Sequence, residues 1–67
     1  MCIKILELIG TSSKNFEDAI QDAVNTAAAS VRNITGVDVL SQKVVIENNK
    51  IVEYRVNVKV AFKIDKK

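Results

Sequence analysis

The chain has 67 residues, which is enough for one domain but leaves room for only a small hydrophobic core. Its net charge is only +2, with both signs spread along the chain, and this excludes the dense basic face of a nucleic-acid-binding protein. It has a single cysteine and no apolar run of membrane-spanning length, so we expect no internal disulfide, no membrane span and, by default, a cytoplasmic location.

The first predicted element is a strand over residues 2–9. This segment is rich in Ile and Leu and alternates only imperfectly, which is typical of a strand that is apolar on both faces. Residues 10–13 (GTSS) are small and mostly polar, and they predict a turn after the strand.

A single helix follows the turn. Asn15 and Asp18 resemble a capping box, with Asn15 as the N-cap. Apolar residues then recur at steps of three and four as far as Ile34, so we expect a helix over about residues 15–33. Its apolar stripe is rich in alanine, and such small side chains allow a helix to lie close to a sheet. Gly36 suits a position just past the end of this helix.

The C-terminal half predicts a hairpin of two strands. Residues 37–47 form a less regular strand pattern, whereas residues 52–64 alternate almost perfectly between apolar and polar side chains. Asn48-Asn49 lies between them and tolerates the positive φ angles of a tight turn.

The predicted fold is α+β: strand, helix, strand, strand, with a three-stranded antiparallel sheet wrapped around one amphipathic helix in a single domain over residues 1–67. One helix covers only one face of such a sheet, and the other face receives much of the remaining apolar surface. We therefore expect a tight oligomer. We expect this second face to carry Leu40 and Val44 of the second strand and part of the first-strand set Ile3, Ile5, Ile9, Leu6 and Leu8.

A hairpin with its tip at Asn48-Asn49 and no bulge places Asp38 opposite Lys59 and Gln42 opposite Arg55, and a bulge near Ser41–Lys43 shifts this register. These polar side chains form either an ordinary cross-strand network or a wall that faces a ligand. In the second case, Arg55 meets an anionic or hydrogen-bonding group of the ligand.

Nothing in the chain predicts an enzyme. There is no histidine, and neither Cys2 nor any serine has a plausible base. Glu17, Asp18 and Asp22 form the only acidic cluster, at the start of the predicted helix. This cluster is either a solvated face that matches the helix dipole or a weak Ca²⁺ or Mg²⁺ patch in an oligomer.

Three segments, LELIGTSSKNFEDAIQDAV, VRNITGVDVLSQ and NNKIVEYRVNVKVAFKI, resemble the dodecin family over about residues 3–64. The resemblance implies a hollow homododecamer of cubic-type symmetry. It also implies a storage protein that stacks pairs of flavins, riboflavin or FMN, at two-fold subunit contacts without using them in a reaction. Its expected partners are copies of itself and a small molecule.

The resemblance also implies site residues. The family's flavin-stacking Trp, shortly after the RNI segment, is replaced by Gly36, which Val37 and Asp38 follow in the chain. Arg55 and Gln42 match the polar positions that face the flavin. Loss of an aromatic stack removes about 1–3 kcal/mol, or roughly 5- to 150-fold in affinity. Three interpretations stay open: weak flavin binding, a different ligand, or a structural or ion-binding shell without flavin.

Overall fold

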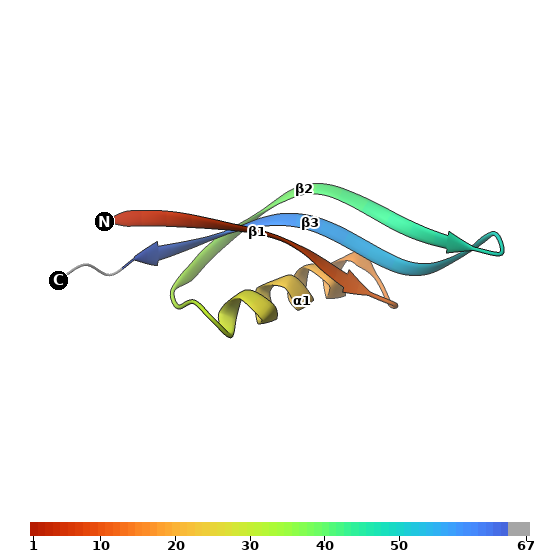
Figure 1. Ribbon diagram of the computed structural model, residues 1–67, viewed down its shortest axis with the longest axis horizontal. Coiled ribbons are helices and arrows are strands. Elements are labelled where there is room, and N and C mark those ends of the chain that lie inside the picture. Colours follow the sequence, from red (N-terminus) through yellow and green to blue (C-terminus); the bar gives the residue numbers. More distant parts are fainter. Residues whose placement is uncertain (65–67) are drawn as a thin grey trace.

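A computed structural model describes residues 1–64 of the chain. The elements follow in the order β1 (Cys2–Ser12), α1 (Phe16–Ala28), β2 (Ile34–Glu47) and β3 (Lys50–Ile64). The strands form one antiparallel sheet in the order β1-β3-β2, with β3 in the centre (Figure 1). This confirms the predicted fold. In the described part of the chain, no helix is long and apolar enough to cross a membrane.

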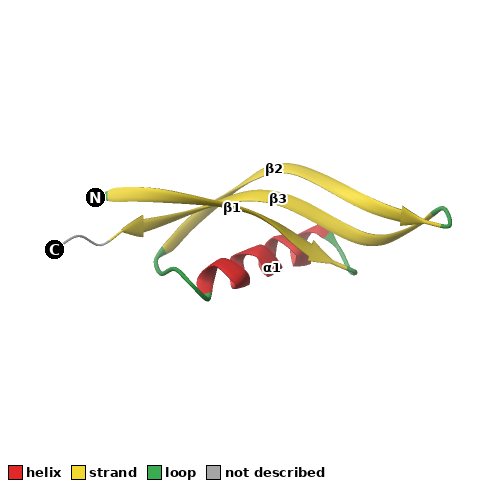
Figure 2. Cartoon of the chain, in the orientation of Figure 1, coloured by secondary structure: helices red, strands yellow, loops and turns green. Residues whose placement is uncertain are grey.

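The helix packs against one face of the sheet and leaves the other face uncovered (Figure 2). Among residues 1–64, the hydrophobic side chains that are completely buried come from α1 and β3 alone, in two sets of three. The predicted alanine stripe therefore faces the regularly alternating strand, as expected. The small alanines bring the helix close to the sheet, and the valines fill the contact. The two sets are Ala19, Ala23 and Ala27, and Val56, Val58 and Val60.

Gly10 is the point of closest approach between β1 and α1. A Cβ atom at this position would lie 1.9 Å from the backbone oxygen of Ala19 and 3.0 Å from the Cβ of Ala23. Gly10 is thus needed for packing and not for a turn, and the predicted turn over 10–13 is wrong. The strand continues to Ser12 because residues 10–12 stay paired with β3.

The N-cap prediction is confirmed. Asn15 is extended, with φ −168°, and its Oδ1 accepts a hydrogen bond of 2.7 Å from the backbone N–H of Asp18. In a capping box, the side chain of the third helical residue also accepts from the backbone N–H of the N-cap. Here the Asp18 carboxylate instead accepts a hydrogen bond of 2.8 Å from the hydroxyl of Ser12. The same hydroxyl accepts from the backbone N–H of Asn15 at 3.4 Å. The buried Ser12 therefore joins the end of β1 to the start of the helix.

The helix ends at Ala28, well before residue 33, so the predicted length is wrong. Val31 lies in the connection and Ile34 begins β2, yet both still pack against the core. Their spacing continued the helical stripe in the sequence, although the chain leaves the helix before either residue. Asn33, with φ 61°, makes the left-handed bend, and Gly36 lies inside β2 without a positive φ.

The hairpin turn is confirmed at Asn48 and Asn49, whose φ angles are 53° and 63°. Two consecutive positive φ angles define the type I′ turn that matches the twist of a hairpin. Glu47 and Lys50 pair directly beside it.

Of the two residue pairs predicted across the hairpin, one is confirmed and one is wrong. Asp38 pairs with Lys59, as expected, but Gln42 pairs with Val56 and not with Arg55. The reason is a bulge in β2, where Leu40 is an extra residue between two pairs of the ladder. Further register shifts lie near residues 35 and 52. Such bulges bend the strands, which explains how this long hairpin curves across the helix (Figure 1).

The subunit is elongated and leaves much apolar surface exposed. It measures 54 × 19 × 13 Å, and its radius of gyration of 13.7 Å exceeds the value of about 11 Å for a compact domain of this length. Its accessible surface of 4964 Å² likewise exceeds the value of about 4,200 Å² for a compact monomer of this mass. The sheet extends beyond the helix at both ends, with the β2–β3 hairpin on one side and the start of β1 and the end of β3 on the other (Figure 1).

The expected second apolar face is present but smaller than predicted. Because paired residues of neighbouring strands point to the same side, Leu6, Leu8 and Val44 lie on the helix side. The exposed apolar side chains of the uncovered side of β1 are Ile3, Ile5 and Ile9, and those near the hairpin tip are Ile46, Ile51 and Val52.

Candidate functional site

We call the side of the sheet turned away from α1 the open face. The buried valines of β3 point toward the helix, so the residues between them, and their partners on β1 and β2, point to the open face. Its members are Ile3, Ile5, Glu7, Ile9 and Thr11 of β1, Glu53, Arg55, Asn57, Lys59, Ala61 and Lys63 of β3, and Gly36, Asp38, Ser41, Lys43 and Val45 of β2.

The structure places three of the five expected site residues on the open face and two on the other. Gly36, Asp38 and Arg55 are on the open face. Val37 packs against the hydrophobic core on the helix side. Gln42 is exposed on that same side because the bulge at residue 40 shifts its pairing. Val37 and Gln42 therefore do not join the other three.

Gly36 and Arg55 are also far apart within one subunit. Gly36 pairs with Ala61, which lies six positions from Arg55 along the same strand. At about 3.3 Å per residue, this separation is about 20 Å. A flavin-sized ligand that contacts both positions therefore needs them from two different copies of the chain.

The surroundings of Gly36 are empty. Within residues 1–64, a Cβ at this position meets nothing within 4 Å apart from its chain neighbours, and the residue is exposed. The backbone here is an ordinary strand without positive φ. The position therefore accepts a large side chain or the flat surface of a ligand.

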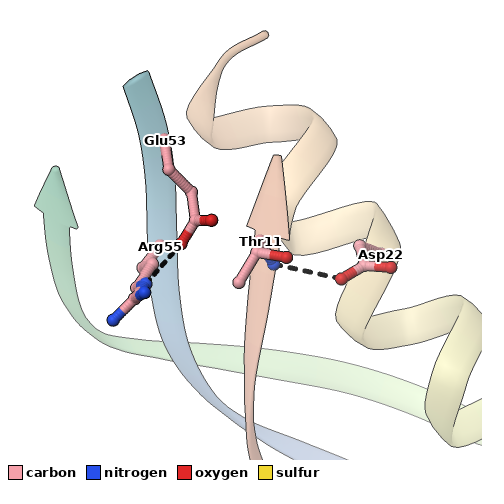
Figure 3. Close-up of polar contacts among 4 residues, drawn as sticks. All are labelled: Thr11, Asp22, Glu53 and Arg55. Atoms are coloured by element: carbon pink, nitrogen blue, oxygen red, sulfur yellow. Dashed lines mark hydrogen bonds and ion pairs between the residues drawn. The ribbon is translucent and has the colours of Figure 1, made fainter. Parts of the chain in front are cut away.

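A shallow depression of about 130 Å³ lies on the open face around Arg55. It is lined by Ile9 from β1, Arg55 and Asn57 from β3, and Ser41 and Lys43 from β2. Arg55 also forms an ion pair with Glu53, with 2.5 Å between Nε and Oε2 (Figure 3). Its side chain is still 44% exposed, so the guanidinium remains accessible to a ligand.

Four of the residues that line this depression were missed from the sequence. Lys43 and Ser41 reach it because the bulge at Leu40 moves them to the open face opposite Arg55 and Asn57. The bulge has no clear signature in the local sequence, so only the structure identifies these neighbours. Ile9 follows from the pairing of β1 with β3.

Two of the three acidic residues in the cluster, Asp18 and Asp22, bind α1 to the end of β1 through hydrogen bonds. Asp22 Oδ2 accepts from the backbone N–H of Thr11 at 3.0 Å (Figure 3), and Asp18 accepts from Ser12. Glu17 and Asp18 line a second depression of about 280 Å³. Within residues 1–64, no three His, Cys, Asp or Glu side chains are close enough to hold a metal ion.

Comparison with known proteins identifies the family. The family model described as Dodecin matches residues 2–65. The calcium dodecin of Mycobacterium tuberculosis is 33% identical over 61 residues, which cover 91% of this chain and 86% of that protein.

Solved structures agree closely with the fold. A mutant of the Thermus thermophilus dodecin is 31% identical, with a TM-score of 0.92 and 97% of both chains covered. The dodecin of Streptomyces coelicolor, at 23% identity, shows the same fold with a TM-score of 0.92 over 98% of this chain and 94% of its own. The crystal structure of the M. tuberculosis calcium dodecin, described as calcium chelating, is 31% identical with a TM-score of 0.84 over 97% and 93% of the two chains. The chain belongs to the dodecin family.

Proposed function

We propose that this protein is a homododecameric storage protein that binds flavin, riboflavin or FMN, without catalysing a reaction. The observation that carries the proposal is the open face, which presents exposed isoleucines together with Gly36 and Arg55 and which no element within residues 1–64 covers. Dodecins bind flavins, so the family supplies the chemical class of the ligand. The absence of a catalytic group in the sequence agrees with a binding role.

Assembly follows from the exposed apolar surface. Ile5 and Ile9 on the open face are 52% and 60% exposed, and Ile46 and Ile51 near the hairpin tip are 53% and 51% exposed. A core of three alanines and three valines gives little stability to a lone subunit. Burial of these isoleucines between copies supplies the missing apolar contact.

Light scattering is expected to give the mass of twelve subunits of 7.4 kDa, or about 89 kDa. Ile5→Lys places a charge on the open face and is expected to lower this mass, because burial of an unpaired ammonium group is unfavourable. A mass near that of one or two subunits for the wild-type chain in ordinary buffer would contradict the proposed assembly.

The flavin site is proposed to form between two copies of the open face. Gly36 and Arg55 are about 20 Å apart within a subunit, and a two-fold axis brings Gly36 of one copy toward Arg55 of another. Arg55 then donates hydrogen bonds to the flavin, while the space above Gly36 receives the ring without an aromatic partner. We expect weaker binding than in a dodecin with the stacking Trp.

Titration with riboflavin and FMN, followed by quenching of flavin fluorescence, tests this site. We expect saturable quenching with a dissociation constant in the micromolar range, on the order of 1–100 μM. Flavin that stays fully fluorescent with protein on the order of 100 μM would refute flavin binding.

The second candidate function is an ion-binding shell without flavin. Its support is the calcium-chelating relative from M. tuberculosis and the depression lined by Glu17 and Asp18. Because one subunit gathers no group of three ligating side chains within residues 1–64, an ion site needs donors from neighbouring copies. Calcium binding detected by calorimetry, together with unquenched flavin, would favour this function over the first.

A further inference from the structure

Arg55 lies in a row of the sheet that gives it no counter-charge. Its direct partner on β2 is the cation Lys43, and its partner on β1 is the uncharged Thr11. Like charges directly opposite each other across two strands are destabilising. With these neighbours alone, the long side chain of Arg55 would turn away from Lys43 and occupy many conformations.

Glu53 provides the missing counter-charge from the same strand. It lies two residues before Arg55 on β3, so both side chains point to the open face. Its own partner across the hairpin is the apolar Val45, so its carboxylate has no cation opposite it on β2. The carboxylate instead reaches along the strand, and Oε2 lies 2.5 Å from Arg55 Nε (Figure 3).

Two other acids of the open face cannot replace Glu53. Glu7 and Asp38 are both paired with Lys59, which lies four residues from Arg55 along β3. At about 3.3 Å per residue, this separation is about 13 Å. The orientation of the Arg55 side chain therefore depends on Glu53.

The geometry of the ion pair leaves most donors of Arg55 unused by Glu53. A guanidinium carries five N–H groups, one on Nε and four on the two terminal nitrogens. Glu53 engages Nε, and the outer end of the guanidinium is turned away from it (Figure 3). The depression is lined by Arg55 and not by Glu53. The pair thus fixes the arginine from the side and leaves its terminal donors available.

We propose that Glu53 is a positioning residue of the flavin site, which holds Arg55 by its Nε and presents the terminal nitrogens to the ligand. The inference rests on the proposed flavin-binding function and adds to it a residue that acts through Arg55. An arginine already held in its binding conformation loses less side-chain entropy when a ligand binds. An ion pair this exposed adds little to folding stability, so its effect is expected in ligand affinity.

A double-mutant cycle with riboflavin tests this role. Riboflavin carries no phosphate, so its affinity responds little to the net charge of the site. We expect Glu53→Gln to weaken riboflavin binding roughly three- to tenfold. In an Arg55→Ala background the same change is expected to alter the affinity by less than about twofold, because no guanidinium is left to position.

Glu47→Gln is the matched control, because it removes the same charge from the same hairpin, beside Lys50 and outside the depression. We expect it to bind riboflavin as the wild-type protein does. Light scattering and urea unfolding are expected to give both glutamine variants the mass and the unfolding midpoint of the wild type. Equal weakening by Glu53→Gln with and without Arg55 would overturn the inference and leave the flavin-binding function intact.

NMR of the arginine Nε–H groups tests the ion pair without any ligand. The chain has two arginines, and Arg32 forms no ion pair within residues 1–64, so it serves as an internal reference. We expect the Arg55 Nε–H to exchange with water more slowly than that of Arg32, and Glu53→Gln to remove the difference. Equal exchange at both arginines in the wild-type protein would overturn the inference. If riboflavin does not bind at all, the proposed function fails, whereas slow exchange at Arg55 still upholds the orientation that Glu53 imposes on it.

Discussion

Gly10→Ala is expected to destabilise the subunit by about 3 kcal/mol or more, enough to prevent assembly at ordinary concentrations. The added Cβ would lie 1.9 Å from the carbonyl oxygen of Ala19, which belongs to the backbone and cannot turn aside as a flexible side chain can. The helix must therefore move away from β1. That movement separates the alanines of α1 from the valines of β3, which form the completely buried core within residues 1–64.

Urea unfolding at a fixed protein concentration measures the effect, since assembly makes the apparent stability depend on concentration. Gly36→Ala is the matched control, because the same added methyl group meets nothing within 4 Å. Its free energy of unfolding is expected to stay within about 0.5 kcal/mol of the wild-type value. A Gly10→Ala protein as stable as this control would show that the helix tolerates a larger distance from β1.

Gly36→Trp is expected to strengthen flavin binding by roughly 5- to 150-fold, the equivalent of about 1–3 kcal/mol for one aromatic stack. The position is exposed and free of neighbours, so the indole ring enters without strain on the subunit. It then lies on the open face, where the proposed contact between two copies receives the ligand. The prediction is that the rest of the flavin site has been retained.

Fluorescence titration with riboflavin and FMN measures this change, and Gly36→Leu is its control because leucine adds apolar bulk without an aromatic face. We expect the affinity of the leucine variant for flavin to exceed that of the wild-type protein by at most about threefold. If the Trp variant binds flavin no better than the Leu variant, stacking is not what the site lacks, and the ion-binding shell gains support.

Much of the fold was predictable because local chemistry encodes it. The alternation over residues 52–64 identified β3, and Asn48-Asn49 identified the turn that precedes it. Asn15 identified the first turn of α1 because its side chain satisfies a backbone N–H that no helical partner can reach. Each of these features depends on residues within a few positions of one another.

The errors arose where distant contacts decide the local structure. Val31 and Ile34 share the helical spacing of the core residues, yet they reach that core from a loop and from a strand. Gly10 has the composition of a turn, but its role is set by Ala19 on a helix that begins after the strand has ended. The residues directly beside each position do not reveal such a contact, because its other side lies on a different element.

The candidate site was likewise predictable from the sequence only in part. The family resemblance named Gly36 and Arg55 as candidate site residues, and the alternation of β3 was enough to place Arg55 away from the buried valines. Sequence patterns could not reveal the bulge at Leu40, because it forms where β2 bends across the sheet. This one extra residue moves Gln42 to the helix side and brings Lys43 opposite Arg55.

The sequence by itself thus determined the order of the elements, the hairpin turn, the alanine and valine core, and the family. These depend on periodicity, turn residues and motif spacing, all of which are local properties of the chain. Only the tertiary structure decided which side chains share the open face, that Gly36 and Arg55 lie too far apart to meet within one subunit, and that two cations face each other beside Asn57. The physical reason is that strand register, once shifted by a bulge, reverses the side on which every following side chain lies.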